Sequence, residues 1–155
     1  MTKDKNGTQT YFFAYGSLKK GYFFGHLMDK HQFMGEALLE GSYQMFLHPD
    51  GFPYIIPSKS ADKQVHGELY RLTSNDVIAD LDLLEGHPGE YTRTDCTVKA
   101  SNNHRYNAFV YVFNAKQSFH GSLLIPKAKY IEDKSTDEHR LKIIKEHGLE
   151  QFLKR

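Results

Sequence analysis

The chain has 155 residues, and 20 Lys and Arg side chains nearly balance 19 Asp and Glu side chains, for a net charge of +1. A chain of this length is expected to form one domain that buries about two-thirds of its unfolded surface. Because no block of one charge sign offers a surface to nucleic acid or an anionic membrane, we expect a small-molecule partner, no nucleic acid and no membrane.

The chain start and the single cysteine predict a cytoplasmic location. Residues 1–8 are polar, with no apolar segment behind the lysines, and no apolar run reaches transmembrane length. Cys96 alone excludes an internal disulfide and fits a reducing compartment.

The first structured segment is an aromatic run that ends in a turn of small residues. Residues 11–15 (YFFAY) predict a strand buried on both faces, and Gly16 and Ser17 interrupt it. One interpretation is that Gly16 only ends the strand. The other is that backbone N–H groups in residues 15–18, which we call the cradle turn, face a ligand and bind its acceptor atoms.

The next part of the chain predicts short strands. Gly35 and Gly41 lie within residues 33–47, which is typical of a bent or bulged strand that curls a sheet into a barrel. The other expected elements are one or two helical turns at 27–30, a turn at 48–53, and strands at 54–57 and 65–72.

A helix is predicted after Thr73, which caps it unless Ser74 does. Its apolar residues recur at helical spacing, and it ends near Gly86, because Pro88 prevents continuation.

Two strands and a second helix complete the expected elements. Strands at 91–98 and 106–113 are joined by a hairpin turn at 101–104. Residues 117–134 have no regular pattern, and the capping box that begins at Ser135 opens a polar helix reaching about residue 154, with a possible break at Gly148.

Most familiar catalytic patterns are absent from the sequence. The nine histidines supply no His-x-x-x-His or His-x-His spacing, so no metal site is expected. Ser17 lacks the second glycine of a nucleophile elbow, and Cys96 fits a core residue of a strand better than a nucleophile. No glycine-rich phosphate-binding motif is present.

Glu85 is the remaining candidate. It follows the last apolar residue of the predicted helix, where burial under the sheet would raise its pKa toward that of a general acid/base near neutrality. From its position alone, an ordinary exposed glutamate in the last helical turn is the better explanation.

Three segments together resemble the gamma-glutamylcyclotransferase-like superfamily, in particular its short gamma-glutamylaminecyclotransferase-type branch. They are Tyr-Gly-Ser-Leu-Lys-Lys-Gly at 15–21, Phe-Pro at 52–53, and Leu-Asp-Leu-Leu-Glu-Gly-His-Pro at 81–88 followed by Tyr-Thr-Arg at 91–93. The resemblance spans about residues 11–113. It implies an α+β fold, with a small curled mixed β-barrel at 10–115, peripheral helices, and an added C-terminal loop and helix at 116–155 packed on the same domain.

The resemblance also implies a reaction and a site. The expected enzyme releases 5-oxoproline and a free amine from a gamma-glutamyl amide, with no cofactor, because the α-amine of the substrate attacks its own γ-carbonyl. Tyr15, Gly16, Ser17 and Leu18 would bind the gamma-glutamyl group, and Glu85 would move the proton. Tyr91 and Tyr111 are candidates for the pocket wall, although core packing is the better explanation for both.

Two alternatives stay open at this stage. One is a binding module on the same scaffold that performs no turnover, since fold does not fix function. The other is a biosynthetic cyclotransferase that removes a gamma-glutamyl protecting group from a larger acceptor.

Overall fold

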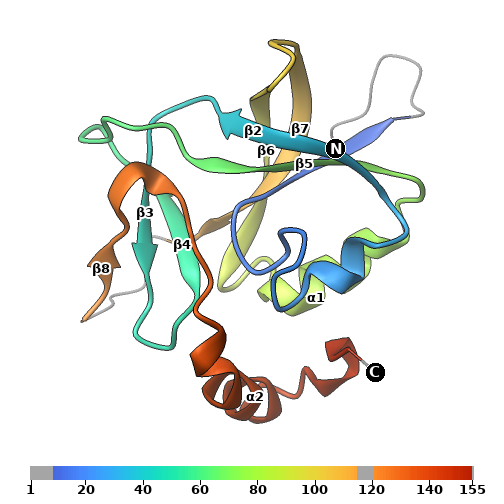
Figure 1. The fold of residues 1–155 in the computed structure, drawn as a ribbon, viewed down its shortest axis with the longest axis vertical. Helices are drawn as coiled ribbons and strands as arrows, with labels where there is room; N and C mark the ends of the chain where they lie inside the picture. Colours follow the sequence, from blue (N-terminus) through green and yellow to red (C-terminus); the bar gives the residue numbers. More distant parts are fainter. Residues whose placement is uncertain (1–8, 115–120, 155) are drawn as a thin grey trace.

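The computed structural model describes residues 9–114 and 121–154, and its largest unit is a closed five-stranded barrel (Figure 1). The strand order is β1-β5-β2-β6-β7, and the barrel closes where β1 pairs in parallel with β7, at Phe12 opposite Phe109. The other neighbours are antiparallel, so the barrel is mixed as expected. Its strands are β1 (Thr10–Ala14), β2 (Gln32–Leu39), β5 (His66–Leu72), β6 (Tyr91–Ala100) and β7 (Arg105–Phe113).

A small second sheet lies beside the barrel, with the order β4-β3-β8 (Figure 1). Its strands are β3 (Tyr43–Leu47), β4 (Pro53–Pro57) and the two-residue β8 (Leu123–Leu124). The sequence did not predict this sheet, because residues 33–47 read as one bent strand. The chain instead leaves the barrel after Leu39, and Gly41, with φ +107°, lies in the connection to the small sheet. The expected irregularity within β2 is present as a register shift between Phe33 and Glu36.

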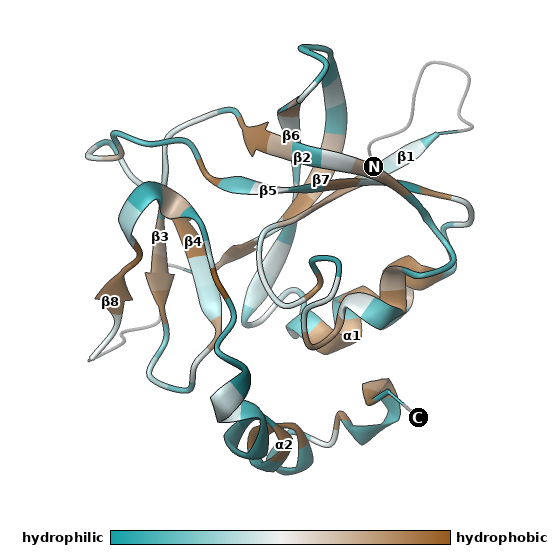
Figure 2. Cartoon of the chain, in the orientation of Figure 1, coloured by the Kyte–Doolittle hydropathy of each residue, from teal (hydrophilic) through white to brown (hydrophobic). Residues whose placement is uncertain are grey.

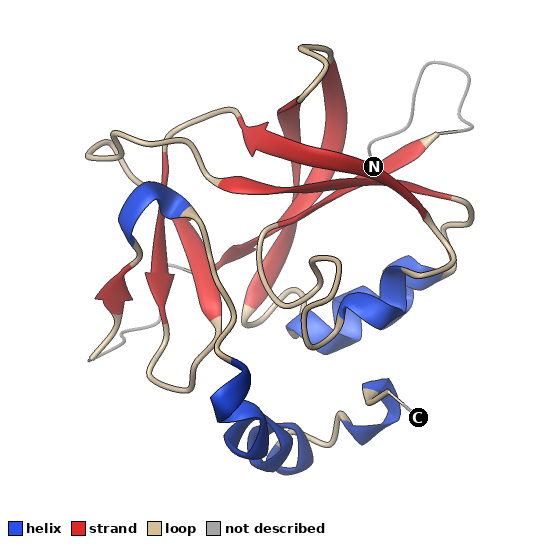
Figure 3. Cartoon of the chain, viewed as in Figure 1, coloured by secondary structure: helices blue, strands red, loops and turns tan. Residues whose placement is uncertain are grey.

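The helices are short, and the two longer ones lie on the same side of the barrel, whereas the 3-10 turn that follows β8 lies by the small sheet (Figure 3). The longer ones are α1 (Val77–Glu85) and α2 (Asp137–Glu146), and the four 3-10 turns are Gly25–Met28, Pro126–Ala128, Lys134–Thr136 and Glu150–Phe152. α2 is the more hydrophilic helix of the two (Figure 2). No helix of the residues described is long and apolar enough to span a membrane.

Both helix starts differ from the prediction. α1 begins at Val77 with Asp76 as its N-cap, and the Ser74 Oγ accepts a hydrogen bond from the Asp76 N–H rather than from the helix. The capping box at Ser135 does not form, because its N–H donates to the side chain of Asp133, which caps a 3-10 turn. α2 consequently begins later and ends before Gly148, whose φ is +68°.

Alternation along β1 divides the core in two. Phe12 and Ala14 belong to a cluster that includes Ile78 and Leu81 of α1, whereas Phe13 and Tyr15 belong to a second cluster with Ile55 and Val110. Because successive side chains of a strand point to opposite faces, β1 is buried on both faces, as its sequence predicts. The strand therefore holds the cradle turn at a fixed place between the barrel and the helices.

Candidate active site

All six residues predicted to form the site line one cavity with a volume of about 540 Å³. The cavity lies where the end of β1, the start of β4, the end of α1 and the C-terminal segment meet. The predicted residues on its wall are Tyr15, Gly16, Ser17, Leu18, Glu85 and Tyr91. The volume is in the usual range for a small-molecule site.

The cradle turn presents backbone N–H groups without internal partners. Its carbonyl groups are occupied, since the Gly16 carbonyl accepts from Lys19 N–H at 3.0 Å and the Ser17 carbonyl accepts from Phe24 N–H at 2.8 Å. Among the described residues, no hydrogen bond is donated by the N–H of Gly16, Ser17 or Leu18. Such N–H groups at a cavity wall form a site for an anionic or carbonyl oxygen.

Gly16 is required by a close approach rather than by an unusual dihedral angle. A Cβ at this position would lie 2.9 Å from Cγ of Pro53, at the start of β4. The two segments can therefore meet only because position 16 has no side chain.

Glu85 is the last residue of α1 and lines the same cavity as the cradle turn. Gly86 ends the helix in the left-handed conformation, with φ 67°, and its N–H bonds the carbonyls of Asp82 and Leu83. Burial, and secondarily the nearby charge of Glu90, raises the pKa of Glu85 to about 8. A carboxyl group of that pKa exchanges protons near neutral pH, as a general acid/base must.

Tyr15 and Tyr91 are buried in the core and also line the cavity. Core packing and a place on the pocket wall, which the sequence offered as alternatives for Tyr91, therefore both apply. The Tyr15 hydroxyl donates to the Tyr111 carbonyl at 2.8 Å, and the Tyr91 hydroxyl donates to the Pro53 carbonyl at 3.0 Å. Burial raises the pKa of Tyr15 and of Tyr91 well above the ordinary value, and the charge of Glu85 raises both further. The two phenols thus stay neutral and form a rigid wall near the carboxyl group.

The sequence did not predict the polar contacts that Asp82 makes next to Glu85. Asp82, one turn earlier on α1, accepts a hydrogen bond of 2.8 Å from the Tyr111 hydroxyl and forms an ion pair with Arg93. These contacts join α1 to β7 and β6 next to the cavity. The spacing of three residues between Asp82 and Glu85 is a signal that was available, because it places both on neighbouring positions of one helix.

The C-terminal segment supplies the remaining wall. Ile143 and Ile144 of α2, followed by His147 and Leu149, line the cavity opposite the barrel. These residues were not predicted as site residues, because the sequence of a polar helix does not reveal what its few apolar side chains pack against.

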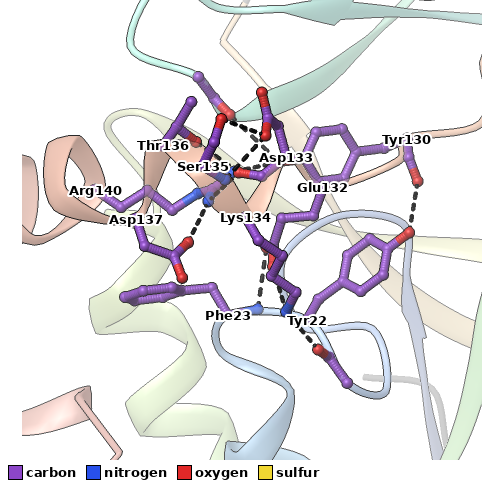
Figure 4. A network of polar contacts seen from close by, with 12 residues as sticks. Tyr22, Phe23, Tyr130, Glu132, Asp133, Lys134, Ser135, Thr136, Asp137 and Arg140 are labelled. Atoms are coloured by element: carbon purple, nitrogen blue, oxygen red, sulfur yellow. Dashed lines mark hydrogen bonds and ion pairs between the residues drawn. The ribbon is translucent and has the colours of Figure 1, made fainter.

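This segment is tied to the loop that follows the cradle turn (Figure 4). The buried carboxylate of Glu132 accepts from the Phe23 N–H at 3.0 Å, and Lys134 Nζ donates to the Gly21 carbonyl at 2.8 Å. The guanidinium group of Arg140 donates to the Tyr130 hydroxyl at 3.1 Å. These contacts hold the C-terminal segment in a fixed position relative to the loop that follows the cradle turn.

Other chemistries find little support in the residues described. No three His, Cys, Asp or Glu side chains within the described ranges come together in a way that would hold a metal ion. Burial, with a smaller effect of Asp95, raises the pKa of the half-buried Cys96 thiol to about 12, which disfavours the nucleophilic thiolate.

Comparisons with known proteins agree with this geometry. The model of the family described as gamma-glutamyl cyclotransferase, AIG2-like, matches residues 12–132. A protein of Methanocaldococcus jannaschii, whose name marks it as a provisional gamma-glutamylcyclotransferase, is 29% identical over 105 residues, covering 66% of this chain and 83% of that protein.

Solved structures share the fold. A mouse AIG2-like protein superposes with a TM-score of 0.61 at 22% identity, over 81% of this chain and 97% of that one. An uncharacterised protein of Pyrococcus horikoshii superposes with a TM-score of 0.59 at 22% identity, over 89% of this chain and 98% of that one. The α+β architecture with a mixed barrel, expected from the sequence, is therefore confirmed.

Proposed function

The chain belongs to the gamma-glutamyl cyclotransferase, AIG2-like family, and from this premise we propose that it converts a gamma-glutamyl amide into 5-oxoproline and a free amine. The observation that supports the proposal most is the shared cavity of Glu85 and the cradle turn. A carboxyl group whose pKa is raised to about 8 faces the same space as three N–H groups that no described residue uses.

Binding begins with the gamma-glutamyl group. The N–H groups of Gly16, Ser17 and Leu18 hold its oxygen atoms, and the aromatic walls of Tyr15 and Tyr91 limit how the chain of the substrate folds. The folded conformation brings the α-amine close to the γ-carbonyl, which lowers the barrier because the reaction becomes intramolecular and correctly oriented.

Ring closure then moves two protons from the α-nitrogen to the leaving nitrogen. Glu85 in its ionised form takes the first proton from the α-ammonium group, and the freed amine forms a bond to the carbonyl carbon of the γ-amide. Glu85 returns that proton to the leaving nitrogen as the bond from the carbonyl carbon to this nitrogen breaks. The ring nitrogen then gives up its second proton, and the amine departs in its ammonium form. The pKa of about 8 matches that of an α-amino group, roughly 8, so the transfer is nearly balanced in free energy.

The chemistry requires no enzyme nucleophile. The protein contributes conformation, N–H groups for the developing oxyanion and a proton carrier. We place the reaction among cyclising acyl transfers. A cytoplasmic setting is part of the proposal, because the single cysteine, Cys96, fits a reducing compartment.

Mass spectrometry tests the function directly. The purified protein is incubated with a panel of gamma-glutamyl amines, gamma-glutamyl dipeptides and glutathione, and both products are quantified. We expect 5-oxoproline and the free amine in equal amounts from at least one amide. Stable substrates across the panel, in spite of measurable binding, would instead favour a binding module.

A further inference from the structure

We propose that the C-terminal segment forms the subsite for the leaving amine, and that this subsite selects an apolar amine without a carboxylate. The inference rests on the proposed function and adds the substrate class. It concerns Ile143, Ile144 and Leu149, which lie beyond residue 132, where the match to the family model ends.

The first step is the size of the cavity. The cradle turn and Glu85 occupy one part of the wall, and a gamma-glutamyl group needs only a fraction of about 540 Å³. The space that remains extends to α2 and the residues that follow it. A substrate whose gamma-glutamyl group lies at the cradle turn therefore places its amine in that space.

The second step is the chemistry of the remaining wall. Ile143, Ile144 and Leu149 present aliphatic side chains, and Leu84 and Phe24 extend this surface from the other elements. Burial of methylene groups against such a wall favours binding by about 0.8 kcal/mol per group, and an alkyl or arylalkyl amine gains most.

The third step is charge. No Lys or Arg of the described residues lines the cavity, whereas Asp50, Glu85 and Glu90 do. Burial lowers the pKa of His48, so this imidazole stays neutral at pH 7, and His147 is exposed. A carboxylate on the leaving group would be repelled by the acidic side chains and would lack a buried cationic partner.

The fourth step is rigidity, since the side chains that select the leaving amine must be held in place. Ile144 and Phe152 are buried in the core cluster that contains Phe12 and Leu81. The carbonyl of Phe152 is also hydrogen-bonded by His26 Nε2 at 2.8 Å. Together with Glu132 and its bond to Phe23 (Figure 4), these contacts fix both ends of the segment.

The test compares matched amides. Initial rates are measured on gamma-glutamyl-propylamine, -butylamine and -pentylamine, and on gamma-glutamyl-aminohexanoate, which adds a terminal carboxylate to an alkyl chain. We expect kcat/KM to rise about fourfold per methylene, the fold-change that burial of one such group gives. We expect the carboxylate to lower kcat/KM by roughly tenfold or more relative to pentylamine.

A variant that introduces a positive charge into the proposed subsite makes the test more specific. Ile143→Lys places a cation at the wall, and Leu141→Lys, on the same helix but exposed and outside the cavity, is the matched control. We expect only Ile143→Lys to improve the rate on gamma-glutamyl-aminohexanoate relative to gamma-glutamyl-pentylamine. If Ile143→Lys fails to fold, Leu149→Ala replaces it and is expected to reduce the preference for longer alkyl chains.

The outcomes separate the two proposals. Turnover with equal or better rates for the carboxylate amide would overturn the subsite and leave the cyclotransferase function intact. Absence of 5-oxoproline from every amide would refute the function. Calorimetric binding of the same amides to Glu85→Gln then decides the subsite, which is supported by tighter binding of the alkyl amides and refuted by any other order.

Discussion

The hydroxyl of Tyr111 on β7 donates a hydrogen bond of 2.8 Å to Oδ1 of Asp82, one turn before Glu85 on α1. The bond fixes the last turn of the helix to the barrel. Because the carboxyl group of Glu85 projects from that turn into the cavity wall, its position depends on a residue that need not touch the substrate.

Tyr111→Phe tests this positioning role. The substitution keeps the ring at the cavity and removes only the bond to Asp82, so we expect a loss of about 1 kcal/mol in unfolding free energy. We expect kcat to fall by roughly tenfold with little change in KM, since the proton carrier is displaced and the cradle turn is not. The measurement is steady-state kinetics of 5-oxoproline release.

Tyr106→Phe is the control, because Tyr106 lies on the same strand and does not line the cavity. An equal loss of kcat in both variants, or a loss in KM alone for Tyr111→Phe, would show that the bond does not position Glu85.

Gly16→Ala tests the cradle turn. A Cβ at position 16 would lie 2.9 Å from Cγ of Pro53, so either the turn or the proline must move. We expect substrate affinity to fall by about tenfold, or roughly 1.4 kcal/mol, as measured by calorimetry. Gly89→Ala is the control, since its nearest contact would be an ordinary 3.6 Å; similar losses in both variants would argue against a special role for position 16.

The rate should depend on pH through Glu85. Its pKa of about 8 means that the ionised form needed to accept a proton declines about tenfold per pH unit below that value. We therefore expect kcat/KM to rise with pH up to about 8. Glu90→Gln should move this rise to lower pH, because the charge of Glu90 is the second cause of the raised pKa. A profile that Glu90→Gln leaves unchanged would mean that another group titrates.

The free energy of unfolding should also depend on pH through Glu85, but it should fall as pH rises. The folded protein holds the proton of Glu85 up to about pH 8, whereas the unfolded chain releases it near 4.5. Between these values the folded state binds more protons, so Glu85 makes the protein less stable as pH rises through this window.

Glu85→Gln removes this pH-dependent loss of stability, because the glutamine side chain does not ionise. We expect the variant to be more stable than the wild type at pH 8.5 by about 2 kcal/mol, after allowing for solvent access, and nearly equal at pH 4.5. Urea unfolding at the two pH values measures it, with Asp80→Asn on the exposed side of α1 as control. A difference that does not grow with pH would contradict the raised pKa.

The sequence predicted the parts of the site that depend on local pattern. The change from aromatic residues to Gly16 and the helix end at Gly86 are both local signals, and each lies where the structure has the cradle turn and Glu85. Their common cavity was expected only through the family resemblance, because no local pattern tells how β1 and α1 approach one another.

The parts that were missed depend on tertiary packing. Ser135 reads as a helix cap, but the carboxylate of Asp133 accepts its N–H and delays the helix. Ile143 lies in a helix that reads as polar, and its place at the cavity follows from the path of the chain around Glu132. The single strand expected at 33–47 divides between two sheets, which no periodicity could indicate.

The central proposal is that Glu85 carries the proton in ring closure, and Glu85→Gln tests it most directly. The variant keeps the size and hydrogen-bonding capacity of the side chain but cannot accept a proton from the α-ammonium group. We expect 5-oxoproline release to fall by about 10²–10⁴-fold, with substrate affinity and fold retained, while Asp80→Asn keeps the wild-type rate. Release of 5-oxoproline at the wild-type rate by folded Glu85→Gln would contradict the proposal.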